Sequence, residues 1–367
     1  MTRRAALALA LLVSLAACDT PIVGGLPLAT GAKHELLVVS DSATWNGVVG
    51  DAVRAELAKP IATLPNQQGA FKLRFQGLAS GLLPGLKKTR NVLFVGPISD
   101  STEVARFLRA RVPEAQREAV EGGRSVALST RDDLWASGQV VTFATAATDS
   151  ILARAILDAG PTLRARYDAN VLAATVVSMF DAGRQTEVEA GLLADHGFAV
   201  NVQHDYLQVQ DTTVTALGRT GQFVRFRRVI PETWRDFFVF YQDGVSELPP
   251  PDELDRLTDR LLQDLVQGTE EDAYVAVDFR RPVTYDTVRV AGYESLEMRG
   301  MWRMVGDLMG GAFIRYAWVD PAQQRLYVYY GMTFAPSRTH DKREFLRQMQ
   351  AIATTFRTSA AAETTDA

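Results

Sequence analysis

The chain begins with a short apolar segment that determines where the rest must fold and which stabilising bonds it lacks. Arg3 and Arg4 precede an uncharged run from Ala5 to Ala17. This run has 13 residues, whereas a stable helix needs about 20 to cross a bilayer. A positive start, a short apolar core and small residues before a cleavage point are typical of a secretory leader. We therefore interpret residues 1–17 as a signal peptide.

Cys18 follows this leader directly and is the only cysteine in the chain. Its place after Leu15-Ala16-Ala17 resembles the lipobox of bacterial lipoproteins, in which the cysteine is lipidated and becomes the mature N-terminus. The alternative is an ordinary signal peptide with a chance cysteine, and the uniqueness of Cys18 favours lipidation. Because no second cysteine exists, the exported fold cannot form a disulfide and must be stabilised by packing. A lipidated sulfur is also excluded from thiol catalysis.

These features predict a cell-envelope protein that faces the periplasm and is bound to a membrane through its N-terminal lipid. Asp19 would favour inner-membrane retention under the sorting rule of enteric bacteria, but the inner and outer membranes both stay open. The net charge of −4 argues against nucleic acid as a partner, because nucleic acid demands a basic surface. An envelope protein is a possible partner.

The first half of the chain alternates apolar strands with amphipathic helices. Glu35 to Ser40 and Asn91 to Val95 are nearly continuous apolar runs, as in central strands. An amphipathic helix is predicted from Thr44 to Lys59, before Pro60. A second helix is predicted to be capped at Asp100, and Gly77 to Arg90 is expected to be a loop. This alternation predicts an α/β sandwich-like lobe.

The second half is richer in strands whose residues alternate between apolar and polar. Phe223–Val229 and Phe237–Tyr241 show this alternation, which is typical of half-buried antiparallel strands. Ala312–Val319 and Arg325–Phe334 are predicted to form a hairpin through Asp320-Pro321. Helices are predicted from Asp252, with one leucine stripe, and after Asp341 as the cap. The fold class is therefore α/β (α+β), with an antiparallel C-terminal sheet packed against helices.

Domain boundaries follow from these patterns. Residues 148–196 are expected to be a helical connection interrupted at Gly160-Pro161. The expected parts are a flexible tether at 18–33, an N-terminal lobe at 34–182, a C-terminal lobe at 183–357 and a disordered tail at 358–367.

The motifs of common catalytic and metal sites are not found. His34, His196, His204 and His340 lack the spacing of a metal site. No G-x-S-x-G nucleophile elbow is present. Gly96 to Asp100 leads from a strand to a helix start, where free N–H groups could hold an anion, but a cap from Asp100 would use these donors. We expect no cofactor and no metal, and we favour a protein that is not an enzyme.

The most distinctive internal stretch runs from Glu297 to Phe313. An Arg beside a Trp can present a planar donor fork to an anionic group, and adjacent glycines permit positive φ and close backbone approach. The alternative, which we favour, is a β-bulge and tight connection with an internal Arg299–Asp307 salt bridge. The candidate ligand-binding residues are Arg299, Trp302, Arg303, Asp307, Gly310 and Gly311.

Several of these residues also carry a family resemblance. The carriers are Trp45 with Val49-Gly50-Asp51, Arg90-Asn91-Val92-Leu93, Asp133-Leu134-Trp135-Ala136, Arg225-Phe226-Arg227-Arg228, Arg299-Gly300 with Trp302, and Met309-Gly310-Gly311. From His34 to Arg357 the chain resembles an uncharacterised (domain-of-unknown-function) lipoprotein family of Bacteroidota-type bacteria. The resemblance implies an envelope location and no established activity. The chain departs from the family at Ala312, where a Pro is expected, and at Gln350, where a Glu is usual.

Two functions therefore stay open. The first is a lipid-anchored, non-catalytic envelope protein that binds a partner or assists assembly. The second is an enzyme or receptor for an anionic envelope ligand, centred on the Arg299–Gly311 stretch. They differ in whether those side chains converge in one open pocket.

Overall fold

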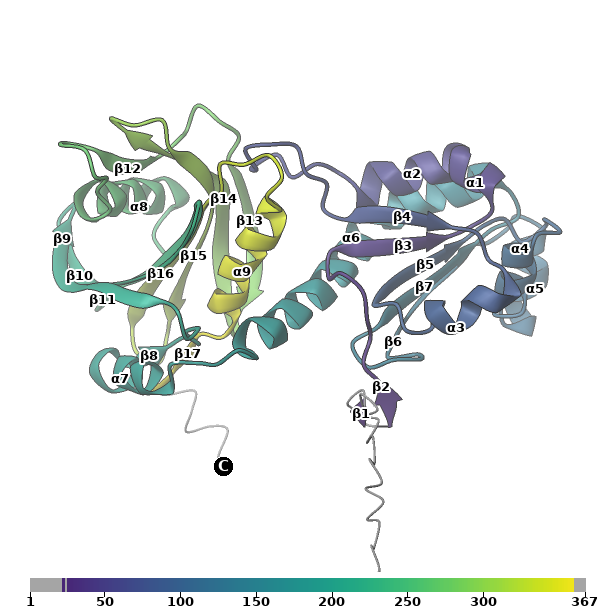
Figure 1. Ribbon diagram of the computed structural model, residues 1–367, viewed down its shortest axis with the longest axis horizontal. Helices are drawn as coiled ribbons and strands as arrows, with labels where there is room; N and C mark the ends of the chain where they lie inside the picture. Colours follow the sequence, from purple (N-terminus) through teal and green to yellow (C-terminus); the bar gives the residue numbers. More distant parts are fainter. Residues whose placement is uncertain (1–21, 24, 360–367) are drawn as a thin grey trace, which may run out of the picture.

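The protein has two lobes, side by side, that share one long helix (Figure 1). The computed structural model describes residues 22–23 and 25–359, so the leader and Cys18 lie outside the described residues, as does most of the predicted tail. The α/β class is confirmed, with a mixed sheet in the N-terminal lobe and an antiparallel sheet in the C-terminal lobe. No helix in the described part of the chain is long and apolar enough to cross a membrane.

The N-terminal sheet has five strands in the order β4-β3-β5-β7-β6, and only β6 is antiparallel to its neighbour. The three central strands are almost completely buried, which explains their continuous apolar sequences. The strands are β3 (Glu35–Val39), β4 (Lys72–Gln76), β5 (Asn91–Val95), β6 (Ala127–Asp132) and β7 (Val140–Thr145).

Short helices cover this sheet and correct three sequence-based expectations. The helix after β3 is broken at Gly47 into α1 (Ser42–Asn46) and α2 (Val48–Leu57). Thr102, and not Asp100, caps the helix after β5, because its side chain accepts the Ala105 N–H. The predicted loop contains helical turns. The elements concerned are the 3₁₀ turn Ser80–Leu82, α3 (Leu83–Leu86), α4 (Glu103–Arg109) and α5 (Glu114–Glu121).

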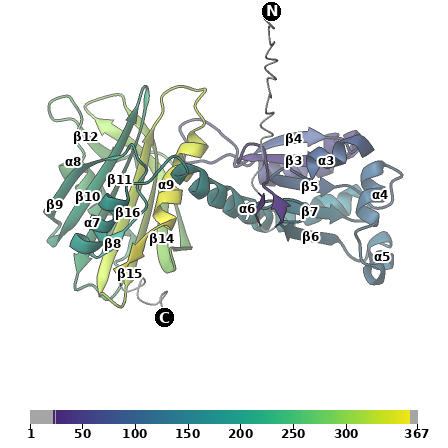
Figure 2. The same ribbon diagram turned by 60° about the horizontal axis from the view of Figure 1, so that its bottom comes forward.

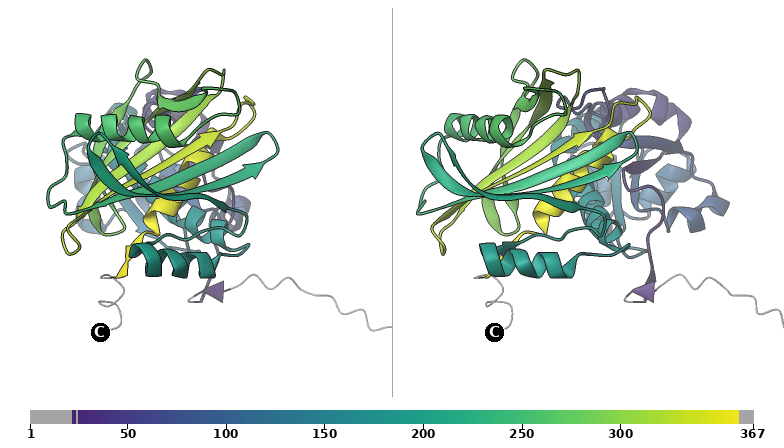
Figure 3. Two further views of the ribbon diagram at one scale, coloured as in Figure 1. Left: turned by 90° about the vertical axis from the view of Figure 1, so that its left-hand side faces the viewer. Right: turned by 60° about the vertical axis from the view of Figure 1, so that its left-hand side comes forward.

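The C-terminal sheet is a curled antiparallel sheet with strand order β12-β14-β15-β16-β11-β10-β9, and β13 also pairs with β14. One face packs against α8 (Pro251–Leu265), and the other packs against α9 (Lys342–Thr354), as Figure 3 shows. The strands are β9 (Leu207–Ala216), β10 (Arg219–Ile230), β11 (Thr233–Asp243), β12 (Tyr274–Val277), β13 (Thr284–Val290), β14 (Tyr293–Val305), β15 (Gly310–Asp320) and β16 (Arg325–Phe334).

The smaller elements of this lobe lie beside α9. Helix α7 (Thr186–His196) leads into β8 (Phe198–Ala199), which pairs with β17 (Arg357–Thr358) after α9. The pairing returns the end of the described chain to the start of its own lobe.

Helix α6 (Asp149–Phe180) joins the two lobes (Figure 2). Its first two thirds pack in the N-terminal core through residues such as Ile156 and Tyr167. Its last turns pack in the C-terminal core through Met179. The expected interruption at Gly160-Pro161 is wrong, because the helix is continuous through Pro161 over 32 residues. The connection is therefore one shared helix.

The expected flexible tether is also wrong for residues 25–33, which lie on the N-terminal lobe. β1 (Ile22–Val23) and β2 (Leu26–Pro27) form a small hairpin. The Ala29 N–H donates to the Ser137 carbonyl at 2.9 Å, and the Thr30 N–H donates to the Lys88 carbonyl at 2.7 Å. Because these bonds join distant segments, sequence composition could not predict them.

Candidate functional site

The structure divides the six predicted ligand-binding residues instead of bringing them into one pocket. Arg299 and Trp302 both lie on β14 but on opposite faces of the sheet, because side chains alternate along a strand. Trp302 is 1% exposed in the core under α8, and its Nε1 donates to the Thr333 carbonyl at 3.1 Å. Arg303 is half-buried opposite Ala276 of β12. Trp302 is thus a satisfied core residue.

The expected Arg299–Asp307 salt bridge is wrong as well. Arg299 binds Glu297 with two hydrogen bonds, from Nε at 2.6 Å and from Nη2 at 2.9 Å. Asp307 is exposed in the turn after β14, where it accepts the Leu308 N–H. Gly310 and Gly311 are paired residues of β15 without positive φ, whereas the nearby Gly306 has a φ of +88°. Gly311 allows the backbones of β15 and β16 to approach closely, because a Cβ at this position would overlap the Thr333 carbonyl oxygen.

Arg299 instead lines a cavity between the two lobes. The cavity measures about 480 Å³ and is bounded by the end of α2, by α6, by β13 and β14, and by α9. Its charged and polar lining consists of Lys59, Arg164, Asp168, Thr284, Tyr285, Asp286, Glu297, Arg299, Arg343, Arg347 and Gln350. Five of these residues are cationic and three are acidic. This interlobe cavity is our candidate site.

The cavity arginines are fixed by bonds that leave some of their donors free. Arg347 donates to Asp168 Oδ1 from Nη2 at 2.5 Å and from Nε at 3.2 Å, and to the Ala70 carbonyl at 3.0 Å. Arg164 uses only Nη1, on the backbone and side chain of Glu56. Arg299 uses Nε and Nη2, which leaves Nη1 for another acceptor. A guanidinium group with fixed orientation and a free N–H is a ready donor for an anion.

Arg347 is the most informative of these side chains. It is 6% exposed, and its Nη1 is buried without a hydrogen-bond partner among the described residues. A buried cationic donor that lacks an acceptor costs free energy. Such groups in native proteins call for an explanation, such as a bound ion or water.

Electrostatics keep the neighbouring charges in place. Burial lowers the pKa of Arg299, but the hydrogen bonds and charge of Glu297 outweigh it, so that the pKa lies above its usual value. Arg299 therefore stays charged inside the cavity. Burial lowers the pKa of the nearby His34 more than the charges of Asp341 and Glu344 raise it. The pKa of His34 therefore lies below its ordinary value.

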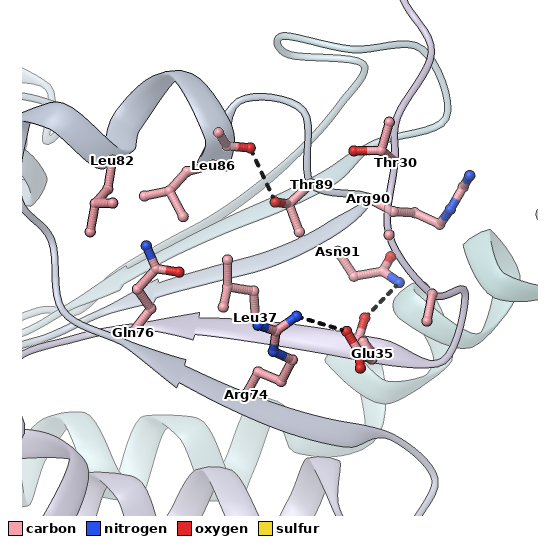
Figure 4. Close-up of a pocket in the computed structure, with 13 residues that line it drawn as sticks. Thr30, Glu35, Leu37, Arg74, Gln76, Leu82, Leu86, Thr89, Arg90 and Asn91 are labelled. Atoms are coloured by element: carbon pink, nitrogen blue, oxygen red, sulfur yellow. Dashed lines mark hydrogen bonds and ion pairs between the residues drawn. The ribbon is translucent and has the colours of Figure 1, made fainter.

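A second cavity of about 280 Å³ lies at the amino ends of β3 and β5, beside α3 (Figure 4). Glu35 accepts a hydrogen bond from Arg74 at 3.2 Å, and the Asn91 amide donates to the Lys33 carbonyl at 2.9 Å. Ligands of open parallel sheets bind at the opposite, carboxyl ends of the strands. This cavity is therefore the weaker candidate.

The carboxyl ends of these strands hold acidic side chains. Burial first, and then the charges of Asp100 and Asp41, raise the pKa of Asp149. Their negative potential disfavours an anion at the Gly96 to Asp100 turn. No group of three metal-ligating side chains is found within residues 25–359.

Sequence reasoning found Arg299 but missed the rest of the interlobe cavity. Its walls come from segments more than 200 residues apart, such as Lys59 and Arg347. No spacing of residues along the sequence indicates such a site. The only available signal was the basic character of the last helix, where Arg343 and Arg347 lie one turn apart.

Comparison with known proteins gives two family matches, which cover separate lobes. Residues 29–180 match a domain of unknown function (DUF8532), and residues 185–355 match a second domain of unknown function (DUF4837). No curated protein matches the chain. The two matches fit an uncharacterised family.

Proposed function

We propose that this protein is a lipid-anchored, non-catalytic binding protein of the cell envelope, and that its interlobe cavity takes an anionic ligand. The observation that carries the proposal is Arg347, which lines the cavity and whose buried Nη1 has no acceptor among the described residues. Arg164 and Arg299 also line the cavity, and each keeps guanidinium donors unused among the described residues. An anionic group would accept from these donors.

The arrangement supports binding more than catalysis. A general base must be free to take a proton from the substrate. Asp168 is bound by Arg347, and Glu297 is bound by Arg299, so both carboxylates are committed to ion pairs. The third cavity carboxylate, Asp286, is exposed and accepts the Thr287 N–H. The buried part of the cavity thus offers oriented donors, which is what anion recognition requires.

A binding measurement tests the ligand proposal. We expect inorganic phosphate or succinate to raise the melting temperature of the chain expressed from Asp19 onward. Arg347→Met should weaken the apparent affinity at least 10-fold, since a charged hydrogen bond contributes about 1.5–3 kcal/mol. Lys59→Met, an exposed change at the cavity rim, should weaken it less without affecting folding.

The matched control is Arg256→Met, because Arg256 forms an exposed ion pair on α8, away from the cavity. Equal affinity in the Arg347 and Arg256 variants would overturn the cavity as the binding site. Absence of any thermal shift with both anions would overturn anion binding by this protein.

The lipid anchor is tested separately, by cell fractionation. Cys18→Ala should leave a foldable protein that is unprocessed or no longer bound to membranes. A variant that still fractionates with membranes after leader cleavage would contradict the lipoprotein interpretation.

A further inference from the structure

The outer strand of the C-terminal sheet presents an open edge. β9 ends the strand order, and no strand in the described part of the chain pairs with its far side. It has 10 residues, of which most are exposed. Figure 1 shows β9 at the end of the C-terminal lobe away from the N-terminal lobe, so the interlobe cavity is not involved.

The backbone of β9 offers regular hydrogen-bonding groups to this edge. The β9–β10 hairpin closes through Leu217 and Gly218, both with positive φ, and Ala216 pairs with Arg219. In a two-residue hairpin the closing pair is hydrogen-bonded, and such pairs then alternate along the ladder. The N–H and C=O groups of Asp211, Thr213 and Thr215 therefore point away from β10, toward the open edge.

β9 lacks the features that usually prevent edge pairing. Natural edges are protected by Lys, Pro, bulges or short length. β9 contains no Lys, Arg or Pro, and its one irregularity lies near its start, opposite Arg225 and Phe226. Its single charge, Asp211, is bound to His196 at 3.1 Å and to Gln208 at 3.0 Å. The segment from Asp211 to Thr215 is a regular, nearly uncharged template for another strand.

The charge pattern of this edge fits a second copy of itself. An antiparallel pair with its two-fold axis at Thr213 places Asp211 of one copy opposite Thr215 of the other. The same register brings together the exposed Val209 and Leu217, which are 42% and 56% exposed. An axis at Asp211 would instead place two carboxylates opposite each other, which is destabilising. Charge thus excludes the register centred on Asp211, and the contact of Val209 with Leu217 favours the one centred on Thr213.

We propose that the β9 edge is a homodimer interface, in which two copies pair antiparallel about Thr213 and their sheets become continuous. A closed two-fold contact of this kind uses the same patch on both copies. Main-chain bonds supply the affinity, and the apolar side chains at the ends set the register.

Sedimentation and cross-linking test this interface on the chain expressed from Asp19 onward, which contains no cysteine. We expect the apparent mass to rise toward twice the monomer mass with concentration. Thr213→Pro should abolish this rise, because it removes an outward N–H but no main-chain bond to β10, although the exposed side-chain bond that Gln222 donates to Thr213 is lost. Thr213→Cys should form a disulfide-linked dimer, since paired Cα atoms about 5.5 Å apart are within disulfide reach.

The matched control is Thr220→Cys, which is also exposed but lies on β10, one strand away from the edge. A mass that stays monomeric at every concentration would overturn the inference. So would a dimer that persists in Thr213→Pro with unchanged affinity, or cross-linking of the Thr220 variant as efficient as that of the Thr213 variant.

Discussion

Gly311 shows how a single residue limits the C-terminal sheet. A Cβ at this position would overlap the Thr333 carbonyl oxygen and would lie 2.9 Å from Trp302 Nε1. The same carbonyl accepts the indole N–H of Trp302. One missing side chain therefore allows β15 and β16 to approach closely and leaves the buried indole with its partner.

Gly311→Ala is expected to lower the free energy of unfolding by about 2–3 kcal/mol, in the range of an overpacked core position. Urea unfolding followed by tryptophan fluorescence measures the change. The control is Gly191→Ala in the interior of α7, where an added Cβ meets nothing within 4 Å. It should stabilise by about 0.5–1 kcal/mol, because alanine favours a helix over glycine. Equal stability of both variants would contradict the steric argument.

Among the elements, α6 carries the connection between the lobes. Ala169 is exposed in its interior, close to Val171 and Leu172, where the packing of the helix passes from the N-terminal core to the C-terminal core. Ala169→Pro removes one helical hydrogen bond and should cost about 3 kcal/mol, whereas Ala169→Gly should cost about 1 kcal/mol. Thermal melts followed by circular dichroism measure both.

A kink at this point should also change the cavity, since Asp168 and Arg347 join α6 to α9. We therefore expect Ala169→Pro, but not Ala169→Gly, to lose anion-induced stabilisation. If the proline variant melted like the glycine variant and bound equally well, α6 would not act as one rigid element.

The sequence predicts those helices and strands whose local residue pattern is sufficient to determine their structure. β3, β5, the β15–β16 hairpin, α8 and α9 have strong apolar periodicity or clear turn residues, and they form as expected. β9 was missed because Gln and Thr dominate an edge strand that buries little. No sequence signal separates β13 from β14, because the turn at Ala291 and Gly292 interrupts no apolar pattern. Likewise, only tertiary packing explains why α6 continues through Pro161.

At the scale of the whole molecule, polar contacts around the start of α9 hold the lobes together beside α6. Lys33 pairs with Glu344 at 3.1 Å, and His34 pairs with Asp341 at 3.2 Å. Gln68 donates to the His340 carbonyl and accepts the Arg343 N–H. These contacts border the wall of the cavity that α9 provides. The relative position of the lobes and the shape of the cavity therefore depend on the same set of charges.

His34 makes this junction sensitive to mild acid. Its pKa is lowered from the ordinary 6.5, because burial disfavours the charged ring more than Asp341 favours it. The unfolded chain then binds a proton at a higher pH than the folded chain does. Stability should fall as the pH drops below about 6.5 and through the lower folded pKa. The pKa of Asp341 is itself lowered despite burial, which raises it, because its bonds to Arg343 outweigh burial. Asp341 loses its contribution only at more acidic pH.

His34→Gln isolates this effect. Between pH 6.5 and pH 5 the melting temperature of the native chain should decrease, and the variant should lose clearly less over this window, because Gln takes up no proton. His204→Gln is the matched control, since His204 is an exposed histidine of the C-terminal lobe. A pH profile of His34→Gln that is parallel to that of the native chain would show that protonation of His34 does not loosen the junction. In His34→Gln, the melting temperature should depend less steeply on pH. If this variant also keeps anion-induced stabilisation at pH 5 while the native chain loses it, the imidazole of His34 couples the junction to the cavity.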